Sequence, residues 1–513
     1  MAIDNQAVLL EVPEQPAIEQ RAVTAKVKLR KVNRDQVMLV NICVEELIRP
    51  DHKARAIWKL VGQMDLSRFE EPLKTREGAQ GRPAWDPHLQ TSLWIYDYSE
   101  GNTAALQIER LMEWEPGLQW LGGLKTVSYH VLSTFRVNQR EALDELFAQL
   151  LGVLEAEGVV NLERVMHDGT KIRAQAGADT LRREKSLKEH LERARQAVKA
   201  MSDPQADQSR AQEAAKQRAL REQEKRLEEA WKEMQAMQAE CKEKEKAEVR
   251  VSLTEPEARQ MKHGDNAIAL SYNAQISTDA ANKIIVGAHL SQSSSDAQSL
   301  MPAMEEVKEN LGEIPAQVVV DGGYTNRNNI AACAEQQIDL VGSLPDPRER
   351  SEASMKSSGI DPAFAPHYFN ILEAGKQLEC PGGCVLNYVR QSVKRGDVYQ
   401  QYQARSGDCQ ACRYQMQCCP KKPEQGRTVS IRVEEHPDVA AFRKKMEQEE
   451  SKAIYRQRGP VAEFPNAWIK EKLGLRKFRV RGMLKAGAEL IWACLTYNVM
   501  QFIRLMKLKA VEG

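Results

Sequence analysis

The chain has 513 residues, which is too long for a single hydrophobic core, and about three folding units are expected for this length. Its 73 Lys and Arg residues nearly balance its 72 Asp and Glu residues. Any affinity for nucleic acid must therefore come from local basic patches. No basic-then-apolar signal segment opens the sequence, and the apolar run 490–503 is too short and too polar to cross a bilayer. We expect a cytoplasmic protein without a membrane partner.

Residues 1–157 are predicted to form a helical N-terminal DNA-binding domain with a basic arm. Residues 21–34 carry six basic side chains and no acidic one, which fits either an arm that binds phosphates or a solvated tail. Asp86 with Pro87 has the pattern of a helix start, and Thr126 or Ser128 is a candidate cap for a later helix. Two short helices joined by a turn also begin helix-turn-helix modules, although ordinary packing helices have the same pattern.

Two aspartates follow apolar, β-branched runs that are typical of buried strands. The run 159–166 leads to His167 and Asp168, which we expect at the end of its strand, and the run 318–320 stops at Asp321. Two further strand patterns and one helical pattern lie between the two aspartates, so a mixed α/β sheet covered by helices is predicted. An aspartate at a strand end is well placed for a metal ion, but a single one is more often a turn or cap residue.

A helical hairpin is predicted over residues 179–250. This stretch is dominated by Glu, Lys, Arg, Gln and Ala, with apolar residues at alternating steps of four and three and one break at Asp203 and Pro204. The pattern indicates two long antiparallel helices inserted into another domain. Such a hairpin serves as a dimer contact or a DNA clamp, or it is only a solvated strut with a narrow apolar seam.

The insertion 346–449 is rich in cysteine. Six of the ten cysteines lie between positions 380 and 419, which suggests metal ligation rather than a disulfide framework. A tetrahedral zinc site is one interpretation, and free thiols are the other. The candidate zinc ligands are Cys380, Cys384, Cys409, Cys412 and Cys418.

The stretch "YRQRGPVAEFPNAWIK" spaces four functional side chains near the end of the chain, namely Tyr455, Arg458, Glu463 and Lys470. Gly459 and Pro460 predict a helix start, which would place Glu463 in the first turn and Lys470 on the same face two turns later. The acid then faces a metal ion and the lysine faces a phosphate, while the tyrosine and the arginine precede the helix and extend the patch along a DNA strand. Three further basic residues, Arg476, Lys477 and Arg479, are predicted to bind phosphates.

This series resembles the Y-R-E-K signature of DDE transposases from bacterial insertion sequences, with one residue more than usual between its arginine and its glutamate. The stretches "DGTKIRA" and "VVVDGGY" resemble the first and second aspartate motifs of the same family, and the resemblance runs from about residue 81 to 504. It implies an RNase H-like catalytic core formed by residues 158–178, 251–345 and 450–513. In that core Asp168, Asp321 and Glu463 bind two Mg²⁺ ions, for which Mn²⁺ can substitute.

The family resemblance implies an α+β multidomain transposase. Its substrates are double-stranded DNAs, the terminal inverted repeats and the target, and its active complex is expected to be a homodimer. Hydrolysis frees a 3′-hydroxyl that is then joined to target DNA, a reaction for which two divalent ions held by carboxylates are suited. A metal-dependent nuclease without strand transfer shares this site. A non-enzymatic DNA-bridging protein explains the hairpin and the basic arm but not the three acids.

Overall fold

The computed structural model describes residues 35, 37, 39, 41–73, 83–200, 210–243, 245–372, 375–394 and 396–512. The predicted basic arm at 21–34 lies outside these ranges. Contacts divide the chain into a first unit, Met1–Cys43, and a second unit, Val44–Gly513. All elements described below belong to the second unit.

Seven helices precede the first strand in the described part of the chain. Asp86 accepts a hydrogen bond from the backbone N of His88 at 2.8 Å and so caps the third helix, whose first residue is Pro87. Ser128 is the N-cap residue of the sixth helix. The helices are α1 Lys53–Val61, α2 Ser67–Glu70, α3 Pro87–Ser99, α4 Ala105–Leu111, α5 Pro116–Gly122, α6 Tyr129–Asn138 and α7 Arg140–Ala156.

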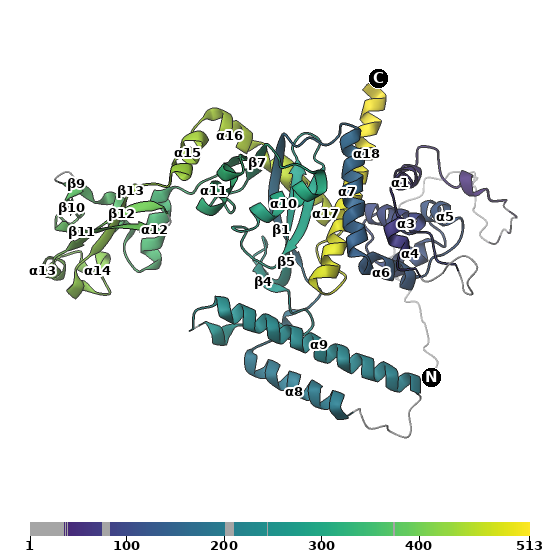
Figure 1. The fold of residues 1–513 in the computed structure, drawn as a ribbon, viewed down its shortest axis with the longest axis horizontal. Coiled ribbons are helices and arrows are strands. Elements are labelled where there is room, and N and C mark those ends of the chain that lie inside the picture. The colour runs from purple at the N-terminus through teal and green to yellow at the C-terminus, as the bar shows by residue number, and fades with distance from the viewer. Residues whose placement is uncertain are drawn as a thin grey trace, which may run out of the picture. The chain divides into compact units, whose positions relative to one another are not determined.

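The central sheet is mixed, as the sequence pattern predicts (Figure 1). Its strands are β1 Arg164–Arg173, β4 Arg259–Lys262, β5 Ile268–Asp279, β6 Ile285–Ser291, β7 Gln317–Val320 and β8 Asp339–Gly342. The order is β6-β5-β1-β7-β8. Strand β4 lies on the same side of β5 as β6 and pairs with the first residues of β5, whereas β6 pairs with the later ones. Strand β5 is antiparallel to β1 and β6, whereas β7 and β8 are parallel to β1. Helix α10, Leu300–Leu311, leads into β7, and helix α11, Arg327–Glu335, connects β7 with β8.

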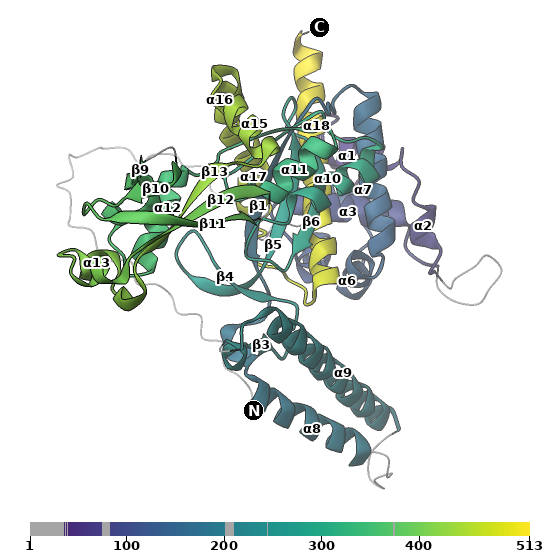
Figure 2. The ribbon, with the colours of Figure 1, turned by 60° about the vertical axis from the view of Figure 1, so that its left-hand side comes forward.

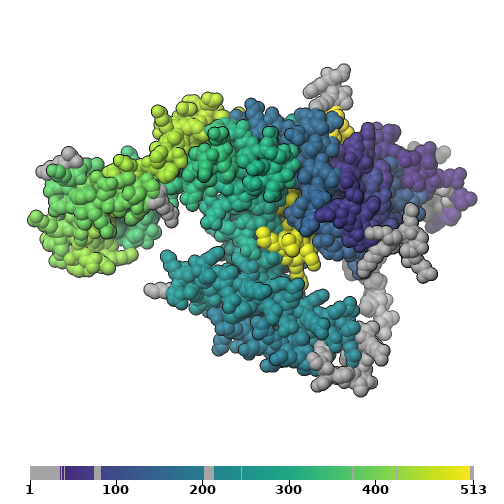
Figure 3. Space-filling model, viewed as in Figure 1, coloured from purple at the N-terminus to yellow at the C-terminus, as the bar shows by residue number. Residues whose placement is uncertain are grey.

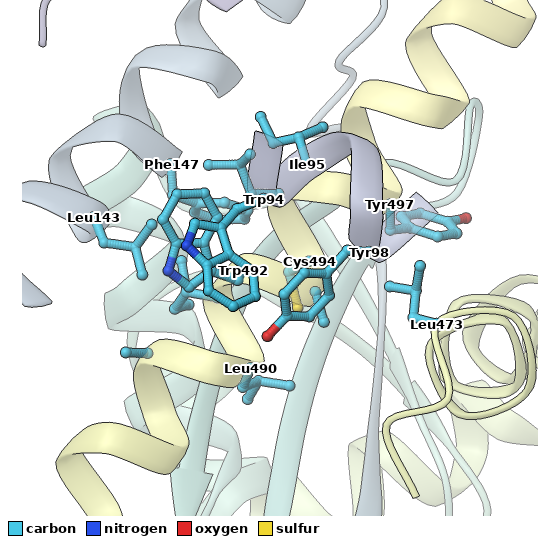
Figure 4. Packing of buried hydrophobic residues seen from close by; sticks show 14 of the residues in the cluster. Trp94, Ile95, Tyr98, Leu143, Phe147, Leu473, Leu490, Trp492, Cys494 and Tyr497 are labelled. Atoms are coloured by element: carbon cyan, nitrogen blue, oxygen red, sulfur yellow. The ribbon is translucent and has the colours of Figure 1, made fainter. Parts of the chain in front are cut away.

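The helices before β1 share one hydrophobic core with the sheet and with the C-terminal helix α18, Met483–Glu512. Trp492 and Cys494 of α18 pack among Trp94 and Tyr98 of α3 and Phe147 of α7 (Figure 4). The C-terminal segment, yellow in Figure 3, shows little surface in that view because other elements cover it. In the ranges that the structure describes, no helix is long and apolar enough to span a membrane. The apolar run 490–503 is part of this core helix.

Two long helices between β1 and β5 form a hairpin, α8 Glu184–Ala200 and α9 Arg210–Glu240 (Figure 1). Leu187 and Leu191 of α8 are buried in one cluster with Leu227 and Met234 of α9, which is the seam that the spacing of apolar residues predicts. A short antiparallel ladder of β2, Leu181–Arg182, and β3, Val251–Ser252, closes the base of the hairpin.

A second sheet follows β8 in sequence and precedes the last helices (Figure 2), and its strands form a hydrogen-bonded ladder of their own. Helix α12, Pro347–Ser357, precedes five antiparallel strands in the order β13-β12-β11-β10-β9. The strands are β9 Asn370–Leu372, β10 Gln377–Glu379, β11 Val385–Lys394, β12 Asp397–Ala404 and β13 Thr428–Glu434. Two short helices, α13 Ser406–Gln410 and α14 Gln415–Cys418, lie between β12 and β13, and α15, Pro437–Met446, follows.

Candidate active site

Asp168 lies in the middle of β1, so the prediction of a strand that ends there was wrong. Strand β5 pairs with β1 along its whole length, from Val165 to Arg173. The parallel partner β7 pairs only with the first three residues of β1, and the last pair is Met166 with Val319. Two residues further along this register, Asp168 stands beside Asp321, the first residue after β7. The two aspartates therefore meet where β7 ends and β1 continues.

A helical element begins at Gly459 and contains Glu463, as predicted, but it is a π-helical turn that follows another helix instead of a loop. Helix α16, Glu449–Arg456, is followed by a π-helical turn, Gly459–Glu463, and by α17, Phe464–Glu471. Tyr455 is thus inside a helix instead of before one. Because a π turn holds more residues than an α turn, it takes up the extra residue of this signature. Pro460 and Pro465 occupy first-turn positions, where a missing N–H costs little.

Arg458 links the first and third acids. Its Nη1 lies 3.7 Å from Asp168 Oδ1, and its Nη2 lies 3.8 Å from Glu463 Oε1. The side chains of Arg458 and Asp168 are 18% and 17% exposed, whereas that of Glu463 is 67% exposed. Arg458 thus stands between Asp168 and Glu463, and Asp321 lies beside Asp168 on the neighbouring strand end.

Burial raises the pKa of Asp168 to about 6. The Arg458 guanidinium opposes this shift, while the charges of Asp321 and Asp296 add to it. A carboxylate with a raised pKa beside other carboxylates marks a place where positive charge is needed.

Asp296 is a fourth acid at the site, and the sequence analysis missed it. It lies between β6 and α10, and its Oδ1 accepts hydrogen bonds from Asn273 Nδ2 at 2.7 Å and from Gln275 Nε2 at 3.0 Å. A Cβ atom on Gly323 would lie 3.0 Å from Asp321 Oδ1 and 3.8 Å from Asp296 Oδ2, so both carboxylates border the same backbone. The serine-rich stretch around Asp296 has the pattern of a loop, and no spacing relates it to the other acids.

His167 is a buried member of the hydrogen-bond network that supports Asp296. It is fully buried, and its two ring nitrogens lie 2.9 Å from Ser277 Oγ and 3.0 Å from Gln275 Oε1. Tyr324 Oη donates to the same Gln275 oxygen at 2.6 Å, which leaves the amide nitrogen of Gln275 to face Asp296. Burial lowers the pKa of His167 to about 3, so the ring is neutral.

The remaining signature residues lie close to the acids. Lys470 is partly buried on α17, where burial lowers its pKa, and its charge interacts with that of Asp168. One turn earlier, Asn466 Nδ2 donates to Asp168 Oδ2 at 3.3 Å, and Asn466 Oδ1 is buried without a partner among the described residues. Tyr455 is half-buried and packs against the cluster that contains Met166 and Val319.

The basic segment after α17 lies beside the end of β1, to which it is joined by backbone hydrogen bonds. The backbone N of Arg173 donates to Arg476 O at 3.2 Å, and the backbone N of Phe478 donates to Arg173 O at 2.9 Å. Arg476, Lys477 and Arg479 are exposed, and Arg476 pairs with Glu471. The predicted phosphate ligands therefore lie beside the end of the strand that carries Asp168.

The donor types at this site fit a hard divalent ion, because carboxylate oxygens are the ligands that Mg²⁺ prefers. The partnerless Oδ1 of Asn466 is a further oxygen beside Asp168. Within the described ranges, however, no three Cys, His, Asp or Glu side chains already stand in ligand geometry. An ion held by both Asp168 and Glu463 would have to take the place of the Arg458 guanidinium. The predicted zinc ligands lie far along the chain from this site and line a cavity beside the second sheet.

Two family profiles match the chain, one described as "Transposase domain (DUF772)" at residues 42–138 and one as "Transposase DDE domain" at residues 379–503. They cover the N-terminal helices and the region that carries Glu463 and α18, and both describe parts of enzymes of DNA transposition. The two matches indicate a DDE-type transposase of the insertion-sequence class. Such transposases cut and transfer DNA and generally use divalent metal ions.

No curated protein matches the chain. Among solved structures, the piggyBac transposase synaptic complex with hairpin DNA was found at 8% identity and a TM-score of 0.30. The match covers 88% of this chain and 74% of that chain. This likeness is too weak to carry an argument about the present fold.

Proposed function

We propose that this transposase binds the terminal repeats of its insertion sequence, cleaves there to free 3′-hydroxyl ends and joins them to target DNA. Asp168, Asp321 and Glu463 are the catalytic acids of this proposal. The observation that supports it is that Arg458 lies within 3.8 Å of both Asp168 and Glu463, while the β1–β7 register brings Asp321 beside Asp168.

The proposal includes an RNase H-like catalytic core. The strand order β6-β5-β1-β7-β8 supports it, because the first three strands are antiparallel and the last two run parallel to β1. The remaining parts of the proposal are the helical N-terminal DNA-binding domain, the hairpin of α8 and α9, and the cysteine-rich insertion. A homodimer, with one protomer at each end of the element, completes the active complex.

Asp168, Asp321 and Glu463 would hold two Mg²⁺ ions, with Mn²⁺ as a substitute. Such a pair, when bound, activates the attacking oxygen and stabilises the leaving oxygen of an in-line displacement. The side chains of the protein would position the scissile phosphate of the DNA. Lys470, near Asp168, and the exposed cations that follow α17 hold the DNA backbone against the acids.

A strand-transfer assay tests the proposed function. The full chain is mixed with a labelled, precut transposon end, a supercoiled target and Mg²⁺, and we expect a covalently joined product. Cleavage of an uncut end without any joining would favour a metal-dependent nuclease. The absence of both reactions with Mg²⁺ and with Mn²⁺, despite end binding, would favour a DNA-bridging protein.

We predict that Gly169→Ala lowers the rate of DNA cleavage by ~100-fold, because a small displacement of an active-site group has costs of this size. The added Cβ would lie 2.7 Å from Asp296 Oδ1 and 2.8 Å from both Gln275 Nε2 and Tyr324 Oη. These atoms must shift, and Asp168 is the adjacent residue. Gly152→Ala on α7 is the matched control, since its Cβ meets no atom within 4 Å. Equal single-turnover rates in both variants would contradict the prediction.

Asp168→Asn is expected to stabilise the metal-free protein while it inactivates the enzyme. The folded-state pKa of Asp168, about 6, lies above the ordinary aspartate value of 3.8, so ionisation of this carboxyl costs stability as the pH rises between those values. Above pH ~7 the variant should gain up to ~3 kcal/mol in free energy of unfolding, and the gain should vanish near pH ~4. Urea unfolding in a chelator measures this, with exposed Asp179→Asn as the control. A stability gain of the variant that increases toward low pH would contradict this prediction.

A further inference from the structure

The second sheet has a small hydrophobic core for five strands. Most side chains of β11 are exposed on both of its faces. The cluster of buried apolar residues at its centre consists of Phe369, Leu378, Leu386, Tyr402, Ala404, Cys409 and Val429. Small modules whose cores are this limited usually depend on an additional crosslink, either disulfides or a structural metal.

Six thiols line one cavity beside this core. They come from three segments of the chain. The first is the turn between β10 and β11, the second is α13 together with Cys412 just after it, and the third is the end of α14 with the residue that follows. The cavity measures about 20 Å³, enough for one water-sized sphere. Its cysteines are Cys380, Cys384, Cys409, Cys412, Cys418 and Cys419, and all six are free thiols.

Backbone amides orient two of the sulfurs. Cys380 Sγ accepts a hydrogen bond from the backbone N of Cys384 at 3.2 Å, and Cys409 Sγ accepts one from the backbone N of Arg427 at 3.3 Å. A Cβ atom on Gly382 would lie 3.6 Å from Cys380 Sγ and also 3.6 Å from Cys412 Sγ. The sulfurs of Cys380 and Cys412, from two separate segments, therefore border the same glycine. Outer hydrogen bonds of this kind fix the orientation of metal ligands.

We propose that this cavity is a structural Zn²⁺ site whose ligands are Cys380, Cys384, Cys409 and Cys412. The two pairs have the spacings C-x₃-C and C-x₂-C, both within the range of structural zinc sites, and four thiolates select zinc over hard ions. Each thiol gives its proton to solvent when it binds the ion. The sulfurs do not yet stand in ligand geometry in the described residues, so binding requires side-chain rotation onto the ion.

Cys418 and Cys419 are outside the proposed ligand set. Cys419 Sγ donates to Lys422 O at 3.6 Å, so this thiol already has a backbone partner. Cys418 borders the cavity from the end of α14 and is the nearest competitor for a ligand position. The zinc would tie the β10–β11 turn to the segment that follows β12, beside a sheet that its own core holds weakly. This role does not depend on the catalytic proposal.

Metal analysis of the full chain tests this site. The protein is purified under reducing conditions without chelator from cells supplied with zinc, and we expect about one zinc ion per chain. The paired variants Cys380→Ser/Cys384→Ser and Cys409→Ser/Cys412→Ser should each retain less than ~10% of that zinc. Cys43→Ser, an exposed thiol of the first unit, is the matched control and should retain it all. Cobalt reconstitution should give the thiolate-to-metal absorption of a tetrahedral sulfur site.

A second measurement covers the case in which the paired variants do not fold. A strong chelator added to the folded wild-type chain should release the zinc and make four additional thiols reactive. Wild-type protein that holds no zinc and takes up no cobalt would overturn the proposal, as would unchanged zinc in both paired variants. Loss of zinc in Cys418→Ser with retention in Cys384→Ser would overturn the assigned ligand set.

Discussion

Asp321→Asn is expected to abolish both DNA cleavage and strand transfer while end binding remains. Asparagine keeps the size of the side chain and its oxygen, so it can still accept the hydrogen bond that Asp321 Oδ1 receives from the backbone N of Gly323 at 2.7 Å. Only the negative charge and one ligand oxygen are lost. We expect a loss of ~1,000-fold or more in either reaction, about 4 kcal/mol of transition-state stabilisation. Asp168→Asn and Glu463→Gln should behave alike.

The control for this series is Glu450→Gln, which removes an exposed acid from the first turn of α16. It should leave cleavage and joining unchanged. Gel-shift titration with a transposon end measures binding, and labelled-end assays measure the two reactions. If one of the three acid variants cleaved DNA within ~10-fold of the wild-type rate, that acid would have no catalytic role.

Arg136→Met is expected to cost about 3 to 5 kcal/mol in free energy of unfolding, because it leaves a buried carboxylate without its counter-ion. Arg136 on α6 is 6% exposed, and its Nη1 lies 3.6 Å from Oε1 of the fully buried Glu489 on α18. It also donates to Thr103 O at 2.6 Å, and its guanidinium lies 4.8 Å from the ring centroid of Trp94. The other carboxylate oxygen of Glu489 accepts from the backbone N of Arg479 at 2.8 Å.

Urea unfolding measures this cost. Arg49→Met is the control, since Arg49 and Asp51 form a pair whose side chains are 85% and 66% exposed, and its loss should cost less than ~1 kcal/mol. The double variant Arg136→Met/Glu489→Met should recover part of the loss, because neither charge then remains buried alone. A single Arg136 variant as stable as the Arg49 control would show that the ion pair does not hold α6 to α18.

Local signals predicted the elements that depend on local chemistry. The cap at Asp86, the apolar seam of the hairpin and the buried strand before Asp321 follow from side-chain periodicity and hydrogen bonding within a few residues. The same local view failed for Asp168. Its strand continues because β5, about a hundred residues later, pairs with it beyond the end of the apolar run.

Features of the site that depend on contacts between distant parts of the chain could not be predicted from the sequence. Asp296 is brought to the acids by amides on β5, and no periodicity marks a loop residue for such a role. Arg136 lay in a stretch that also fits a DNA-facing helix, yet the structure buries it against Glu489. The signature itself was readable, but the π-helical turn that accommodates its extra residue is visible only in three dimensions.

The account rests on three carboxylates that can share divalent ions. Crystals of the full chain grown with Mn²⁺ and transposon-end DNA, measured for anomalous scattering, test this most directly. We predict manganese peaks coordinated by Asp168, Asp321 and Glu463, with Arg458 withdrawn from between the first and third acids. Manganese bound elsewhere, while Glu463 remains on Arg458 and turned away from the two aspartates, would contradict it.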